Sequence, residues 1–139
     1  MAAGSPSPVV PSRRQARERA LSLLYEAETK GITPAALLAD LPIDPAPFAG
    51  QLVAGVGEHA EEVDGYIRRF AKGWALERMP ALDRAIVRIG TYELLYRPDV
   101  PTGAILSEAV ELATTYSTDE SSRFVNGLLA EIAREVRPE

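Results

Sequence analysis

The amino-acid sequence predicts an all-α protein of 139 residues. Apolar residues recur at intervals of three and four along most of the chain, which is the spacing of one helix face. No segment alternates apolar and polar residues as a half-buried strand does. Proline, glycine and capping residues separate the periodic segments, as they do at helix boundaries. The length is that of one domain, and we expect residues 12–139 to form it.

The first predicted helix begins after Ser12, a good N-cap, and ends before Gly31. Its core-facing stripe consists of Ala16, Ala20, Leu23, Leu24 and Ala27. Residues 1–11, MAAGSPSPVVP, show no periodicity and are rich in small residues and proline. We therefore expect these residues to form a disordered N-terminal tail.

Basic side chains lie beside the apolar stripe of this first helix. The arc holds three arginines, continued two turns later by a tyrosine: Arg13, Arg14, Arg17 and Tyr25. Positive charge at a helix start opposes the helix dipole, and nothing in the sequence pattern requires it there. An anionic partner is one explanation. A solvated basic helix start, partly neutralised by Glu18 and Glu26, is the other.

The middle of the chain predicts short helices. Thr33-Pro34 opens one that runs to about Ala39. Asp44-Pro45 repeats this capping signal and precedes a helical apolar stripe that reaches Trp74. Gly55 and Gly57 can break this stripe into two helices. His59 is expected at the surface.

The helix expected after Pro80 has apolar residues on two flanks, so we predict a central position for it. We expect Arg84, Arg88 and Thr91 to point away from its inner face. Glu93 falls on the apolar face, where a carboxylate must be paired or hydrogen-bonded. A buried bridge between helices is favoured over catalysis, because no second acid or histidine accompanies it.

Two helices are predicted in the C-terminal part, one from about Thr102 to Tyr116 and one after the capping residues STDESS. Phe124 lies at the edge of the last helix's apolar stripe, beside Arg123. An aromatic ring next to an arginine can stack on an RNA base. The ring can equally fasten the helix to the core, and the sequence pattern leaves both interpretations open.

The composition excludes several classes of site. The chain has no cysteine and one histidine, which argues against thiolate or histidine metal sites and against a Ser-His triad. No glycine loop of the phosphate-binding kind is present. We expect no metal, no cofactor and no enzymatic activity. No apolar run approaches a membrane span and no signal peptide is visible, so a cytoplasmic protein is expected.

The net charge of −5 is unevenly distributed. Residues 12–19 contain four arginines and one glutamate, so the rest of the chain carries −8. A general nucleic-acid binder is basic over a broad face. A small basic surface on an acidic body instead suits a narrow RNA footprint together with a cationic protein partner.

Several segments, in order, resemble the NusB family of transcription antitermination factors: SRRQARERALSLLYEAE, LVAGVGEHAEEVDGYI, LDRAIVRIGTYELL, DVP, SEAVELA and FVNGLLAEI. The resemblance implies a compact bundle of about seven helices in two packed sub-bundles. It also implies binding of boxA RNA in nascent rRNA transcripts, jointly with the small-subunit ribosomal protein NusE. The wider assembly would contain NusA, NusG and RNA polymerase, and some members of the family form homodimers.

Carried over by position, the resemblance implies two RNA-contacting groups. Arg13, Arg14, Arg17 and Tyr25 match the first, and Arg123, Phe124 and Asn126 match the second. Asp83 matches the region that faces NusE. Two alternatives remain: a helical protein-binding adaptor without an RNA role, and the RNA-binding domain of an rRNA cytosine methyltransferase. The latter needs a further catalytic domain with a cysteine.

Overall fold

The computed structural model describes residues 10–138, and within them the chain forms seven α-helices and one 3-10 helix. The elements are α1 (Arg13–Lys30), α2 (Pro34–Asp40), α3 (Pro47–Glu58), α4 (Ala60–Phe70), η1 (Leu76–Arg78), α5 (Ala81–Tyr96), α6 (Thr102–Tyr116) and α7 (Asp119–Val136). The predicted all-α fold is confirmed. Residues 1–9 of the predicted tail lie outside the described residues.

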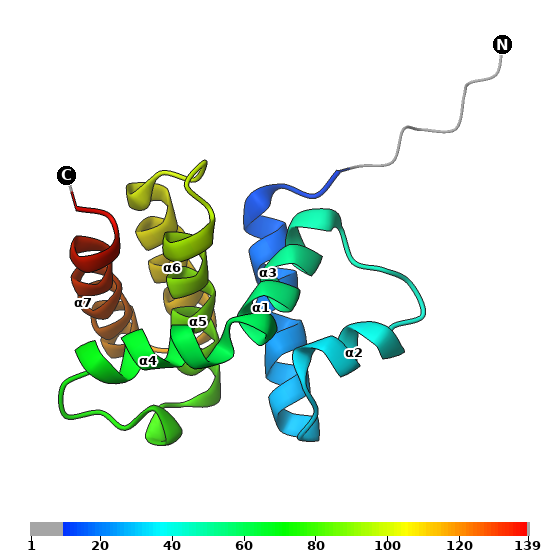
Figure 1. Cartoon of the computed structure of the whole chain (residues 1–139), viewed down its shortest axis with the longest axis horizontal. Coiled ribbons are helices and arrows are strands. Elements are labelled where there is room, and N and C mark those ends of the chain that lie inside the picture. Colours follow the sequence, from blue (N-terminus) through cyan, green and yellow to red (C-terminus); the bar gives the residue numbers. More distant parts are fainter. Residues whose placement is uncertain (1–9, 139) are drawn as a thin grey trace, which may run out of the picture.

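The helices are arranged in two groups (Figure 1). One contains α1, α2 and α3, and the other contains α4 to α7. Helix α5 contacts α1, α3, α4, α6 and α7, so it joins the two groups. Its second apolar flank is buried, with Val87 0% and Leu94 3% exposed, which confirms the predicted central position.

Local capping signals account for the well-predicted helix ends. At the start of α1, the Ser12 hydroxyl accepts from the Gln15 amide at 3.1 Å, and the Gln15 side chain accepts from the Ser12 amide at 2.9 Å. This reciprocal pair satisfies two amides that the helix leaves free. At the other end, Gly31 adopts φ 67°, a left-handed conformation that favours glycine. The predicted bounds of α6 are also confirmed.

Two boundaries in the middle of the chain differ from the prediction. Helix α3 begins at Pro47, whose N-cap is Ala46, so Asp44 does not cap it. The long stripe is interrupted at His59, between α3 and α4, close to the expected break. Trp74 does not continue the stripe, because α4 ends at Phe70 and Trp74 lies in the following turn, 55% exposed.

The prediction that three polar residues of α5 point away from the core is wrong. Thr91 is fully buried. Arg84 and Arg88 are partly buried, and both pair with Glu28 of α1. The physical reason is the number of helices around α5, which leaves its polar residues facing a neighbouring helix. Arg84 also donates to the carbonyls of Leu76 and Met79, which fixes η1 against α5.

Candidate nucleic-acid interface

The most deeply buried ion pair joins Arg17 of α1 to Glu93 of α5. Arg17 Nη2 lies 2.7 Å from Glu93 Oε1, and Arg17 Nε lies 2.9 Å from Oε2. The side chains are 5% and 1% exposed. This bidentate geometry compensates the loss of hydration that a buried ion pair suffers. The predicted role of Glu93 as a buried bridge is confirmed, and the placement of Arg17 on an exposed basic strip is wrong.

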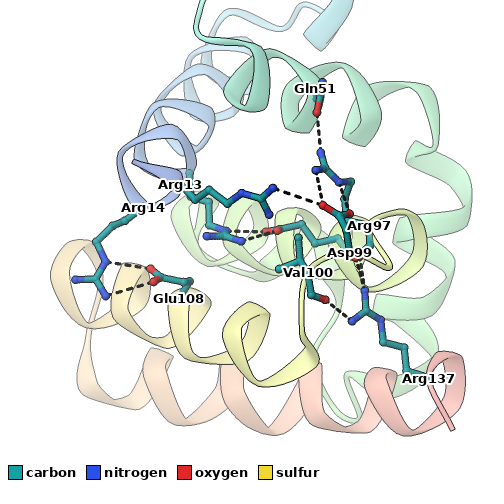
Figure 2. Close-up of polar contacts among 10 residues, drawn as sticks. Arg13, Arg14, Gln51, Arg97, Asp99, Val100, Glu108 and Arg137 are labelled. Carbon is teal, nitrogen blue, oxygen red and sulfur yellow. Dashed lines mark hydrogen bonds and ion pairs between the residues drawn. The ribbon is translucent and has the colours of Figure 1, made fainter. Parts of the chain in front are cut away.

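Arg13 and Arg14, by contrast, are exposed at the start of α1. Arg14 Nε lies 3.1 Å from Glu108 Oε2 of α6, and Arg13 Nη2 lies 3.5 Å from Asp99 Oδ2 (Figure 2). The two arginine side chains are 51% and 57% exposed. Ion pairs between exposed groups contribute little to stability. Both guanidinium groups can therefore exchange their carboxylate partners for phosphate at small cost.

The turn between α5 and α6 adds a third arginine, Arg97, to this surface. Arg97 donates to Asp99 at 2.9 and 3.0 Å, and to Gln51 of α3 at 2.6 Å (Figure 2). These hydrogen bonds from Arg97 hold the pKa of Asp99 well below its ordinary value. The guanidinium carbons of Arg13 and Arg97 lie 4.7 and 4.9 Å from the centroid of the Phe48 ring. This ring therefore packs among cations.

Sequence reasoning did not assign Arg97, Asp99 or Phe48 to the site. The signal available was the segment RPDVP, in which two prolines bracket a charged turn just after the central helix. Nothing in that local pattern indicates that the turn would lie beside α1.

Arg137, after α7, holds this turn in place. Its guanidinium donates to the carbonyls of Arg97 and Val100, each at 2.7 Å (Figure 2). It also donates to the carbonyls of Leu94 at 2.9 Å and Glu93 at 3.0 Å. A cation at the carbonyl end of a helix is favoured by the helix dipole and satisfies unpaired carbonyls. Arg137 thereby fixes the position of the residues that contact Arg13.

The second predicted group lies in the first half of α7. Thr118 caps this helix, its hydroxyl accepting from the Ser121 amide at 3.0 Å. Arg123 and Asn126 are exposed, and Phe124 is half-buried. The Phe124 ring lies 5.8 Å from the ring of Trp74. The ring is thus partly packed and partly accessible.

Helix α6 connects the two predicted groups. It pairs with α1 through Glu108 and Arg14, and its Thr114 hydroxyl lies 2.8 Å from the Ser122 hydroxyl of α7. The hydroxyl of Tyr116 donates to Glu18 of α1 at 2.6 Å. Tyr25, further along α1, is 43% exposed. The two groups thus lie on α1 and α7, and side chains of α6 contact both helices.

Asp83 does not lie where the resemblance implied. Its side chain is buried, 4% exposed, and its Oδ2 accepts from the Ser121 hydroxyl at 2.7 Å. The expectation that Asp83 contacts a protein partner is corrected: it joins the first turns of α5 and α7. A carboxylate in the first turn of a helix is also stabilised by the helix dipole.

Among residues 10–138, no group of three or more metal-ligating side chains occurs, and no helix is long and apolar enough to cross a membrane. A groove of about 850 Å³ has mostly apolar walls formed by residues of α1 to α5. Among the charged residues that line it, Arg88 pairs with Glu28 and with Asp64.

A helical fold that carries exposed arginines and accessible aromatic rings on α1 and α7 has the features of a helical nucleic-acid-binding module. The sequence model of the NusB family matches residues 14–134. A transcription antitermination protein NusB from Kineococcus radiotolerans is 50% identical over 126 residues, covering 88% of this chain and 93% of the relative. One from Beutenbergia cavernae is 47% identical over 137 residues, covering 88% and 90%.

Solved structures agree with these relatives. T. maritima NusB superposes with a TM-score of 0.81 at 31% identity, covering 91% of this chain and 94% of that one. A NusB in complex with NusE and dsRNA superposes with a TM-score of 0.76 at 26% identity, covering 88% and 96%. The chain belongs to the NusB family of transcription antitermination proteins, which are RNA-binding regulators and not enzymes.

Proposed function

We propose that this chain binds the boxA element of nascent rRNA transcripts together with NusE, and so promotes processive rRNA transcription. The observation that carries the proposal is the pair of exposed arginines at the start of α1, whose ion pairs with Asp99 and Glu108 lie at the surface. Membership of the NusB family and the solved complex of a relative with NusE and dsRNA support it.

Each residue has a distinct part in the proposed interface. Arg13 and Arg14 contact phosphates, which supply affinity and orientation but no sequence information. Phe124 stacks on an unpaired base, while Asn126 contacts a base edge. Arg123 supplies a phosphate contact beside them, and Tyr25 extends the surface along α1. Arg17 does not touch RNA: its bond to Glu93 positions the helix that carries Arg13 and Arg14.

Charge favours a basic protein partner on the remaining surface. Outside residues 12–19 the chain carries −8, which attracts a basic protein and disfavours misaligned docking. We propose NusE as that partner, with NusA, NusG and RNA polymerase in the wider cytoplasmic assembly. Where RNA and NusE share contacts, each improves the other's binding by the same factor. A homodimer would compete for the same surface.

The test is a titration of labelled single-stranded boxA RNA with and without NusE, over a range of salt concentrations. We expect the Arg13→Gln/Arg14→Gln variant to bind more weakly, with a salt slope lower by about 0.7 log unit per lost phosphate contact. NusE should strengthen binding to the parent chain.

A matched control removes two other exposed charges in surface ion pairs. Lys30 and Arg68 are 58% and 55% exposed, so Lys30→Gln/Arg68→Gln makes the same change in net charge. It should leave the slope close to that of the parent. Equal losses of RNA affinity in both variants would show that net charge, and not the position of Arg13 and Arg14, causes the weaker binding. Binding of NusE with no RNA retention at moderate salt would favour the protein-binding adaptor.

A further inference from the structure

The turn after α4 presents a tryptophan to solvent. Helix α4 ends at Phe70, and the buried Ala71 anchors the turn, its carbonyl accepting from the Trp74 amide at 3.0 Å. Gly73 adopts φ 79°, which a residue with a side chain rarely does. Trp74 emerges from this defined turn with 55% of its surface exposed. Burial alone does not explain an aromatic residue that keeps half its surface in water.

The exposed ring lies beside the aromatic residue of the proposed RNA surface. The centroids of Trp74 and Phe124 are 5.8 Å apart and the rings are inclined at 55°. Both line a shallow groove of about 290 Å³ between α7 and the turn after α4. A Cβ added at Gly127, which also lines the groove, would meet nothing within 4 Å. The groove is therefore open above α7.

The charges around the groove suit a polyanion. Lys72 and Arg123 line it, and both are exposed. Glu131 also lines it, and this carboxylate accepts from Arg134 Nη1 at 2.8 Å, so its charge is partly neutralised. Two exposed cations and two aromatic rings on one groove suit a polyanion with unpaired bases better than an apolar peptide.

We propose that Trp74 is a second base-stacking residue, and that the groove between Trp74 and Phe124 takes a nucleotide of single-stranded RNA next to the one on Phe124. Lys72 and Arg123 contact its flanking phosphates. The inference rests on the proposed RNA-binding function and extends the footprint from α7 to the turn after α4. It requires an unpaired strand, because the bases of a duplex are not available for stacking.

Fluorescence offers a direct test, since Trp74 is the only tryptophan in the chain. The full chain is titrated with single-stranded boxA RNA, following tryptophan emission, acrylamide quenching and the anisotropy of labelled RNA. We expect emission to fall and the ring to become protected from acrylamide, with the same midpoint as the anisotropy. Binding with neither tryptophan change overturns the Trp74 assignment and leaves the proposed function intact. No binding by either readout overturns the proposed function itself.

Variants test whether the ring contributes to affinity. Trp74→Ala should weaken RNA binding about 5- to 10-fold, the lower end for loss of one stacked base, and Trp74→Phe should retain most of the affinity. Ile43, 81% exposed between α2 and α3, provides the control Ile43→Ala, which should bind RNA as the parent does. Unchanged RNA affinity of Trp74→Ala overturns the proposal. So does a loss confined to NusE binding, which would make the groove a protein-docking site.

Discussion

Arg13, Arg14 and Arg17 share one arc of α1 but have different surroundings. Arg13 and Arg14 face solvent and pair loosely with carboxylates of the second helical group. Arg17 faces α5, where water is excluded and Glu93 is its partner. A buried charge is tolerated only when a partner replaces its hydration. The first two arginines are therefore available for ligands, and the third is part of the framework.

Loss of Arg17 should destabilise the fold strongly. We expect Arg17→Gln to lower the free energy of unfolding by about 3–5 kcal/mol, because Glu93 is left buried without a cation. Denaturant unfolding followed by circular dichroism measures this. Arg14→Gln, at an exposed site on the same helix, should differ little from the parent.

A double variant distinguishes loss of the whole ion pair from loss of one partner alone. Arg17→Met/Glu93→Met leaves no uncompensated charge, so it should be more stable than either single replacement. If Arg17→Gln were as stable as Arg14→Gln, the buried pair would not hold α1 to α5.

The ionisation of Asp99 should depend on Arg97. Hydrogen bonds from Arg97 lower the pKa of Asp99, so the ionised group stabilises the folded state above its unfolded pKa, near 3.9. That contribution is lost as the pH falls through the folded pKa. Carboxyl carbon shifts in an NMR titration should give a midpoint below the ordinary range. Arg97→Gln should raise the midpoint, and an unchanged midpoint would show that another group is responsible.

Whether a residue's place is predictable depends on how near its partners lie in sequence. The cap at Ser12 involves Gln15, three residues away, so sequence reasoning located it. Arg17 meets Glu93 76 residues later. Sequence reasoning predicted that Glu93 must be paired but could not name its partner. Asp83 was predicted at the wrong place for the same reason, because its hydrogen-bond partner Ser121 lies on another helix, 38 residues later.

At the scale of the element, the helices are predicted well because their period and capping residues are local. The close contacts between helices are not predicted, because they join residues far apart in the sequence. Gly90 of α5 packs against Leu129 of α7, where an added Cβ would lie 2.6 Å from the Leu129 Cδ1. Trp74 left the predicted stripe because Gly73 turns the chain after Phe70. The periodicity of apolar residues continued there by coincidence.

Two of the helical glycines, Gly90 and Gly65, should respond oppositely to replacement by alanine. Gly90→Ala should destabilise the fold by about 1–3 kcal/mol, the usual effect of overpacking. Gly65→Ala in α4 should stabilise it by about 0.5–1 kcal/mol, since nothing lies within 4 Å of the new Cβ and alanine is the better helix former. Thermal melting compares the two directly, and stabilisation by Gly90→Ala would show that α5 and α7 are not tightly packed there.

At the scale of the whole molecule, α5 is the common neighbour and its two ends are held differently. Its first turn is tied to α7 by Asp83 and Ser121, and its last carbonyls accept from Arg137. The proposed RNA surface thus depends on a residue far from the RNA. The distribution of the surface over α1, α6, α7 and two turns explains why its outline did not follow from sequence patterns.

Removing Arg137 should loosen the turn between α5 and α6. We expect Arg137→Ala to cost about 2–3 kcal/mol of stability, because several carbonyls lose a charged donor. Amide hydrogen exchange should quicken most at Arg97 and Val100, whose amides are hydrogen-bonded at this turn. Arg134→Ala, at an exposed site on the same helix, serves as the control. Equal protection of the turn in both variants would show that Arg137 does not hold it.

The hydrogen bonds of Arg137 also bear on how the chain folds during translation. Arg137 follows Glu93, whose backbone carbonyl accepts one of its hydrogen bonds, by 44 residues. At about 5–20 residues per second, about 2–9 s pass between translation of the two. Until Arg137 is translated, the carbonyls at the end of α5 lack its charged donor, whereas Arg17, the partner of the Glu93 carboxylate, precedes Glu93 in the chain. The turn beside Arg13 is therefore the last part of the surface to be completed, and we expect hydrogen exchange on ribosome-arrested chains to show it unprotected until Arg137 has emerged.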